Sequence, residues 1–218
     1  MDNAQNIKNL LLSSKNPVVV VGTDLSPHDS IPAGVAIAKF IEENNKKADL
    51  QLVYLGDKSL LDEELTSLYN VSPQLEVKGN SLKIKVDMKN LSKPIEKLNW
   101  EKSEDDTVLT FELKPIDKGF SENRVKIVKD LHTFDLLIAI GISTKNKLLA
   151  LNEDKTMFND SKIINIDVNS GNESYGTENI IQEGNTVSYL IFNMFAALKE
   201  KISREVAKSL LIGFKKED

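Results

Sequence analysis

Short apolar runs mark four positions along the chain where the sequence predicts buried strands. The first, Pro17–Gly22, places four consecutive valines before a glycine. Continuous β-branched runs are typical of strands buried on both faces of a parallel sheet. Similar runs at Leu50–Leu55, Asp135–Ile140 and Ile163–Ile166 predict three further strands.

Helical periodicity appears between and after these runs. Apolar residues recur at spacings of three and four in Ala33–Asn44, Thr186–Leu198 and Ser203–Phe214, which predicts amphipathic helices. Lys58–Tyr69 predicts a shorter helix, and residues 1–15 a short amphipathic one. Strands that alternate with helices indicate an α/β class, here a Rossmann-like parallel sheet flanked by helices.

The middle of the chain changes to a period of two. Apolar residues alternate with charged ones in Leu82–Val86 and again in Leu109–Leu113, and a further strand is expected around Trp100. We therefore predict an antiparallel β-hairpin insertion over Ser81–Pro115 within a single α/β domain that covers residues 1–218. Trp100 is expected to pack on the apolar face of this hairpin, and a platform for a nucleobase is the alternative.

Composition excludes several classes of function. The chain has no cysteine, which excludes disulfides, thiol catalysis and cysteine-bound zinc, and its two histidines exclude a His-rich metal site. The formal net charge is −5 and the lysines are scattered among acids, so no strong nucleic-acid patch is expected. No apolar run approaches the roughly 20 residues of a membrane span, and the N-terminus is not typical of a secretory signal. We expect a cytoplasmic protein.

Two acids follow predicted strands and are the candidates for chemistry. Asp167 ends the strand run Ile163–Ile166, and Asp29 lies in the loop after the first strand. Ligands of open α/β sheets bind at the carboxyl ends of strands, so both acids are candidate handlers of a metal or a phosphate. The alternatives are structural: Asp29 as a cap of the helix that follows it, and Asp167 as an Asx turn.

The stretch IINIDVNSGNESYG, from Ile163 to Gly176, resembles the signature segment of the DHH phosphoesterase family, in which Asn-Ile-Asp-His-His precedes a small-residue loop. An ordered set of segments supports the resemblance, among them FDLLIAIG, FNDSKIINID, NESYGTENII and VSYLIFNMF. It extends roughly over residues 18–214. The segment LTFELKPIDKGFSENRV also resembles an insertion in DHH-like proteins of candidate-phylum bacteria.

The resemblance implies two-metal hydrolysis, in which two manganese or magnesium ions hold a bridging water. Two of the family's ligand positions keep an acid in this chain, Asp29 and Asp167. The others hold residues that do not replace the family's histidines and aspartates: Thr23, Pro27, Gly141, Val168 and Asn169. The family's last aspartate lies beyond the final helix, where Glu217 or Asp218 matches only roughly.

This pattern favours a degenerate, catalytically inactive DHH-like domain that acts as a binding or assembly module. Its crevice would take a nucleotide or another phosphate-bearing small molecule, with loop positions Thr23, Gly141, Val168, Asn169 and Asn172 beside it. The alternative is a residual Mn²⁺- or Mg²⁺-dependent phosphoesterase or oligonucleotide nuclease that uses Asp29 and Asp167.

The resemblance predicts how the chain is organised, and the apolar residues of its last helix bear on how it associates. It ends where the family reaches its linker, so the C-terminal DHH-associated domain is expected to be absent. A homo-oligomer or a protein partner could use the hairpin or the last helix, where Leu210, Leu211 and Phe214 would then form an exposed apolar patch.

Overall fold

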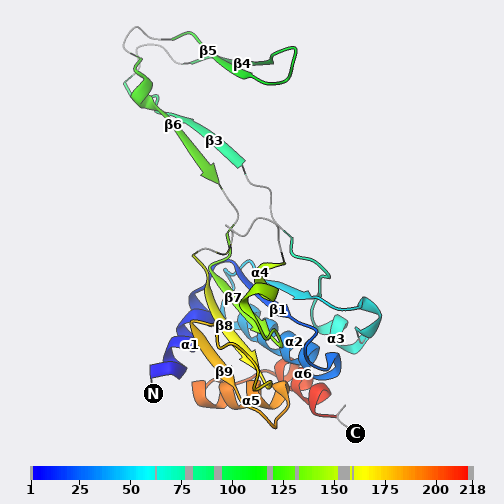
Figure 1. Cartoon of the computed structure of the whole chain (residues 1–218). Coiled ribbons are helices and arrows are strands. Elements are labelled where there is room, and N and C mark those ends of the chain that lie inside the picture. The colour runs from blue at the N-terminus through cyan, green and yellow to red at the C-terminus, as the bar shows by residue number, and fades with distance from the viewer. Residues whose placement is uncertain are drawn as a thin grey trace. The chain divides into compact units, whose positions relative to one another are not determined.

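The computed structural model describes residues 2–61, 63–76, 81–90, 95–116, 120–130, 133–151, 158 and 160–215. These residues divide into two compact units (Figure 1). The sheet unit comprises Met1–Val77 and His132–Asp218, and the insertion unit comprises Lys78–Leu131. Glu217 and Asp218, which match the family's last aspartate only roughly, lie outside the described residues.

The sheet unit is built on five parallel strands. They are β1 (Pro17–Val21), β2 (Gln51–Tyr54), β7 (Leu136–Ile140), β8 (Lys162–Asp167) and β9 (Glu178–Ile181). Their order is β2-β1-β7-β8-β9, and every neighbouring pair is parallel. The α/β class and the four strands predicted from apolar runs are confirmed. The fifth strand, β9, was missed because its sequence ENII is half polar and it lies half-buried at the sheet edge.

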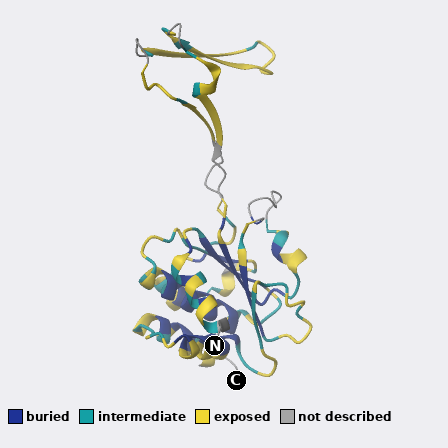
Figure 2. Cartoon of the chain, turned by 90° about the vertical axis from the view of Figure 1, so that its left-hand side faces the viewer, coloured by how far each residue is buried: buried dark blue, intermediate teal, exposed yellow. Residues whose placement is uncertain are grey.

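Alternate residues of the strands face two separate cores. On one face, Val19 and Val21 pack with residues of four helices: α1 (Asp2–Ser13), α2 (Pro27–Asn44), α5 (Val187–Leu198) and α6 (Arg204–Lys215). On the other face, Val18 and Val20 pack with Phe134, Phe158 and Leu148 of the short helix α4 (Lys145–Leu149). Figure 2 shows the central strands in dark blue, and every residue of β1 and β7 is buried. Strands packed on both faces therefore position the carboxyl edge of the sheet.

Two predicted helices differ in their bounds from those observed. Helix α2 begins at Pro27 and not at Ala33, so Asp29 lies in its first turn rather than in a loop. Proline suits the first helical position because its fixed φ matches the helix and its missing N–H has no partner there. The segment Lys58–Tyr69 forms a short 3₁₀ helix, Lys58–Leu60, followed by α3 (Glu63–Leu68).

The insertion unit consists of two antiparallel ribbons. In the first, β3 (Ser81–Val86) pairs with β6 (Val125–Asp130), and in the second, β4 (Lys97–Lys102) pairs with β5 (Leu109–Lys114). A short 3₁₀ helix, Glu122–Arg124, precedes β6. The insertion thus extends beyond the predicted limit at Pro115. Strand β6 was missed because its sequence VKIVKD places two apolar residues side by side and breaks the alternation.

The ribbons keep their apolar faces in solvent, as Figure 2 indicates by colour. Trp100 lies opposite Phe111, on the face where apolar packing was predicted. However, 65% of Trp100 and 48% of Phe111 are exposed, so none of the described residues covers this face. Ile127 of the other ribbon is 66% exposed.

A second apolar surface lies on helices α5 and α6. Leu211 and Phe214 are exposed, as expected for a patch at the last helix, whereas Leu210 is buried. Tyr189 and Phe192 of α5 extend the patch, and the ring of Phe192 lies 6.5 Å from that of Phe214 between centroids. Among the described helices, none is long and apolar enough to cross a membrane.

Candidate binding site at the carboxyl edge of the sheet

The strand order places a topological switch point between β1 and β7. The chain leaves β1 toward β2 on one side and later adds β7 on the other side, so the loops after β1 and β7 diverge. Open α/β sheets bind ligands at such a point. Two glycines let the diverging loops approach closely: a Cβ on Gly22 would lie 2.2 Å from the carbonyl oxygen of Gly141, and Gly141 itself has φ +61°.

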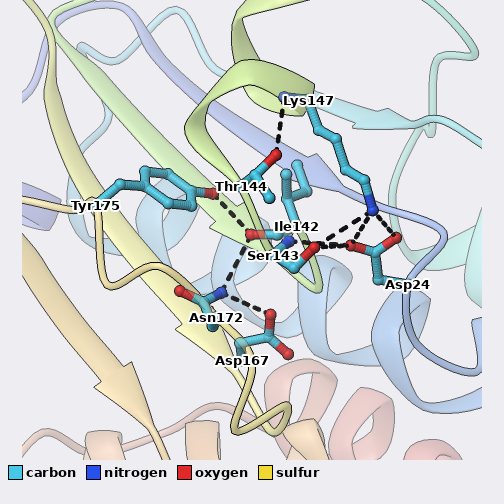
Figure 3. A network of polar contacts seen from close by, with 8 residues as sticks. All are labelled: Asp24, Ile142, Ser143, Thr144, Lys147, Asp167, Asn172 and Tyr175. Atoms are coloured by element: carbon cyan, nitrogen blue, oxygen red, sulfur yellow. Dashed lines mark hydrogen bonds and ion pairs between the residues drawn. The ribbon is translucent and has the colours of Figure 1, made fainter.

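A carboxylate and an ammonium group meet at this switch point (Figure 3). The Nζ of Lys147 lies 2.7 and 2.8 Å from the two carboxylate oxygens of Asp24. Ser143 donates to the same carboxylate from its N–H at 3.0 Å and from its Oγ at 2.7 Å. Partial burial tends to raise the pKa of Asp24, but the hydrogen bonds from Lys147 and Ser143 outweigh it and hold that pKa below its ordinary value. Asp24 is therefore a charged, fully partnered carboxylate.

The neighbouring strand β8 ends on a second partnered carboxylate. Asp167 is fully buried, and its Oδ2 accepts a hydrogen bond of 2.7 Å from the side-chain amide of Asn172. Its Oδ1 accepts from the N–H of Asn169 at 3.0 Å, which confirms the Asx turn that was the structural alternative for this residue. Asn165, also fully buried, donates to the Oδ1 of Asn172 at 2.6 Å and holds the amide in place.

The carbonyl oxygen of Ile142 joins the two clusters. It accepts hydrogen bonds from Asn172 at 3.2 Å and from the hydroxyl of Tyr175 at 2.9 Å (Figure 3). Burial raises the pKa of Tyr175, and the negative charges of Asp167, Asp24 and Glu173 add to the effect. Tyr175 is therefore a neutral donor at physiological pH, and it ties the loop after β8 to the loop after β7.

Asp29 stands apart from this network and caps a helix. It is buried, with 6% exposed, and its Oδ2 and Oδ1 accept from the N–H groups of Val187 and Ser188 at 2.6 and 2.9 Å. These N–H groups belong to the first turn of α5, where a carboxylate also meets the positive end of the helix dipole. Asp29 was expected to cap its own helix, but because α2 already begins at Pro27, it caps α5 instead.

The other predicted crevice positions lie in solvent, pack in the core or shape a loop. Thr23 is exposed directly after the β1 loop glycine, and Val168 packs against the helix-covered core. The Oδ1 of Asn169 accepts from the N–H of Gly171 at 2.9 Å and shapes the loop. Of the predicted positions, the structure thus brings Gly141, Asp167, Asn169 and Asn172 to the switch-point network.

These residues do not fit a bridged two-metal centre. Among the described residues, no group of three or more histidine, cysteine, aspartate or glutamate side chains could hold a metal ion. Hard divalent ions need several oxygen ligands, and the carboxylates of this edge each have donors of the protein instead. At Asp24 that donor is itself a cation, Lys147, so the local charge is already balanced.

Sequence reasoning missed Asp24, Ser143, Lys147 and Tyr175. A signal was present, since Asp24 lies three residues after β1 while Ser143 and Lys147 lie within seven residues of the end of β7. What the sequence lacked was the strand order. Only the adjacency of β1 and β7 shows that these loops meet.

A hollow of about 480 Å³ adjoins Lys147 on the side of β2. Its lining combines apolar side chains with one amide: Leu55, Pro73, Gln74, Leu75, Ala150 and Leu151. Pockets for small molecules commonly measure about 300–1,000 Å³ and are mostly apolar with few polar groups. The hollow thus has the size of a small-molecule site, although more of its exposed lining is polar than apolar.

Comparison with known proteins supports the fold. No family model and no curated protein matches the chain. Among solved structures, an exopolyphosphatase-related protein from Bacteroides fragilis is similar, with a TM-score of 0.55 and 12% sequence identity. The match covers 98% of this chain and 49% of that protein, so the chain spans about half its length. At this identity the similarity shows a shared fold and no more.

Proposed function

We propose that this chain is a DHH phosphoesterase-like domain that does not hydrolyse phosphate esters and serves as a binding module. The observation that carries the proposal is the ion pair between Lys147 and Asp24 at the switch point. A divalent cation would have to displace the ammonium group to reach this carboxylate. Asp167 likewise has its two oxygens occupied by Asn169 and Asn172.

The ligand that we propose is a phosphate-bearing small molecule of nucleotide size. The hollow beside Lys147 offers apolar side chains to a base or similar ring, and the ammonium group at its rim suits a phosphate. The side chain of Lys147 is 55% exposed, so it can turn toward a ligand. The similarity to an exopolyphosphatase-related protein, though it concerns the fold alone, agrees with a phosphate-bearing ligand.

Hydrolysis can be tested directly with Mn²⁺ or Mg²⁺ and a chromogenic phosphodiester. We expect the same rate with the purified protein as with buffer, and no micromolar Mn²⁺ binding by calorimetry. The matched variants are Asp167→Asn at the carboxyl end of β8 and Asp160→Asn, an exposed acid at its amino end. Turnover that is lost in the first variant and retained in the second would overturn the proposal in favour of a residual metal-dependent phosphoesterase.

Binding is tested by calorimetry with nucleoside mono- and triphosphates. We expect Lys147→Ala to weaken binding and Lys162→Ala to leave it unchanged, because Lys162 is an exposed lysine at the opposite edge of the sheet. Equal affinities of both variants and the wild type would show that the switch-point edge is not the ligand site.

A further inference from the structure

The insertion unit carries a concentration of positive charge that the scattered lysines of the sequence do not suggest. A hollow of about 680 Å³ lies along the β3–β6 ribbon, and four cationic side chains line it against a single acid, Asp87. The cations are Lys85, Lys89, Arg124 and Lys126. Ser121, Asn90 and Asn123 add polar groups to the same lining. In a chain of net charge −5, this surface attracts anions.

Backbone carbonyl groups hold Arg124 in place, and no ion pair satisfies the three lysines among the described residues. Arg124 donates from one guanidinium nitrogen to the carbonyl oxygens of Asp87 and Lys89, at 3.2 and 2.7 Å. Lys85 and Lys126 lie directly opposite each other in the ribbon register. Like charges in this position destabilise a strand pair, and an anion bound between them would relieve the repulsion. Within the described part of the chain, no ion pair involves Lys85, Lys89 or Lys126.

The second ribbon of the same unit presents two aromatic rings to solvent. Trp100 and Phe111 are directly opposite each other across β4 and β5, so their side chains share one face. Leu98 and Leu113 continue this face, whereas Glu101 and Glu112 point to the other face because side chains alternate along a strand. Both acids still border the hollow that Trp100 and Phe111 line.

We propose that the insertion unit binds single-stranded nucleic acid, with the backbone phosphates at the β3–β6 hollow and unstacked bases on Trp100 and Phe111. Proteins that bind single strands combine a positively charged groove with aromatic side chains on which bases stack. Both parts occur here within one compact unit. Lys97 at the start of β4 lies seven positions after Asn90 at the hollow, so an extended chain allows at most about 25 Å between their Cα atoms.

Trp100 supplies the first readout because it is the single tryptophan of the chain. A single-stranded oligonucleotide of about 12 nucleotides, within the usual range of site sizes, is titrated into the full chain at low salt. We expect saturable quenching of Trp100 fluorescence. Inorganic polyphosphate of equal charge should occupy the hollow without quenching. The proposal would be overturned if the oligonucleotide failed to quench Trp100 fluorescence. It would also be overturned if the oligonucleotide and polyphosphate bound with equal affinity and replacement of Trp100 changed neither affinity.

Two pairs of variants separate backbone contacts from general charge. Lys85→Gln with Lys126→Gln removes the cross-strand pair at the hollow, and Lys97→Gln with Lys114→Gln removes an equivalent cross-strand pair on the polar face of the other ribbon. Binding is measured by anisotropy of a labelled oligonucleotide. The first pair should make the negative slope of log K against log salt shallower by about 1.4, since each phosphate contact contributes about 0.7 for single strands. Equal effects of both pairs would contradict a localised site.

The aromatic platform is tested in the same anisotropy assay. Trp100→Ala should weaken binding about 5- to 150-fold, the range that the loss of one stacked base produces, with an unchanged salt slope. A second copy of the chain is the competing occupant of this face. Self-association would give dimers in light scattering and a blue shift of Trp100 fluorescence as the protein concentration rises. These two results, with no effect of the oligonucleotide on the fluorescence, would overturn the proposal.

Discussion

Replacement of Asp29 by alanine should remove the contact that holds the start of α5 to α2. Both carboxylate oxygens accept hydrogen bonds from buried N–H groups, and the serine that supplies one of them, Ser188, also donates from its Oγ to the Asp29 carbonyl at 3.2 Å. In the alanine variant the N–H groups of Val187 and Ser188 have no acceptor there and remain buried away from water.

The expected loss is large for a single substitution. A hydrogen bond to a charged group contributes about 1.5–3 kcal/mol, so two give about 3–6 kcal/mol. The total stability of a domain is about 5–15 kcal/mol, and at this chain length 1 kcal/mol shifts the melting temperature by about 2–4 °C. A loss of about 4 kcal/mol therefore corresponds to about 8–16 °C. Asp29→Asn keeps one acceptor and should lose about half as much.

Urea and thermal unfolding, each followed by circular dichroism, measure this loss. Asp160→Ala serves as the control, because surface substitutions usually change stability by less than about 0.5 kcal/mol. The reasoning is refuted if Asp29→Ala costs less than about 1 kcal/mol. It is equally refuted if Mn²⁺ stabilises the wild type and this stabilisation disappears in the variant, because Asp29 would then act as a metal ligand.

Three further predictions concern the two polar networks. Lys147→Ala should cost less than about 1 kcal/mol at neutral pH, because the lysine is half exposed. The lowered pKa of Asp24 means that its contribution is present above the ordinary value of 3.8 and is lost as the pH falls below it, so denaturation curves of variant and wild type should converge there. Tyr175→Phe should cost about 1 kcal/mol at pH 7. Since the pKa of Tyr175 is raised in the fold, the wild type should lose stability above pH 10 relative to this variant. Gly213→Ala should lower the melting temperature despite a gain of about 1 kcal/mol in helix propensity, because the new Cβ would lie 2.9 Å from the Cβ of the buried Ser188 and overpacking costs about 1–3 kcal/mol.

The sequence located most elements of the sheet unit because their burial is visible in composition. Four consecutive valines have no stable place other than a strand covered on both faces, and they form β1. The start of α6 is also encoded locally, because the Oγ of Ser203 accepts from the N–H of Val206 in the first turn of the helix. Strand β9 and the short helix α4 lack such a pattern, because both are brief and only partly buried.

The candidate site was only partly predictable. The Asx turn at Asp167 depends on residues two positions apart, so the sequence could suggest it. Lys147 and Asp24 are 123 positions apart, and no local rule joins them. The same holds for Asp29 and Ser188, which are 159 positions apart.

The sequence by itself determined the α/β class, the order of the main strands and helices, and the presence of an antiparallel insertion, since periodicity and burial are encoded locally. Only the tertiary structure decided which charged groups meet. In the fold, Asp24 forms an ion pair with Lys147 at the switch point, and Asp29 accepts hydrogen bonds from the first turn of α5. Four cations line one hollow of the insertion unit: Lys85, Lys89, Arg124 and Lys126. The physical reason is that charge complementarity acts through space, between loops and strands whose adjacency the local pattern does not contain.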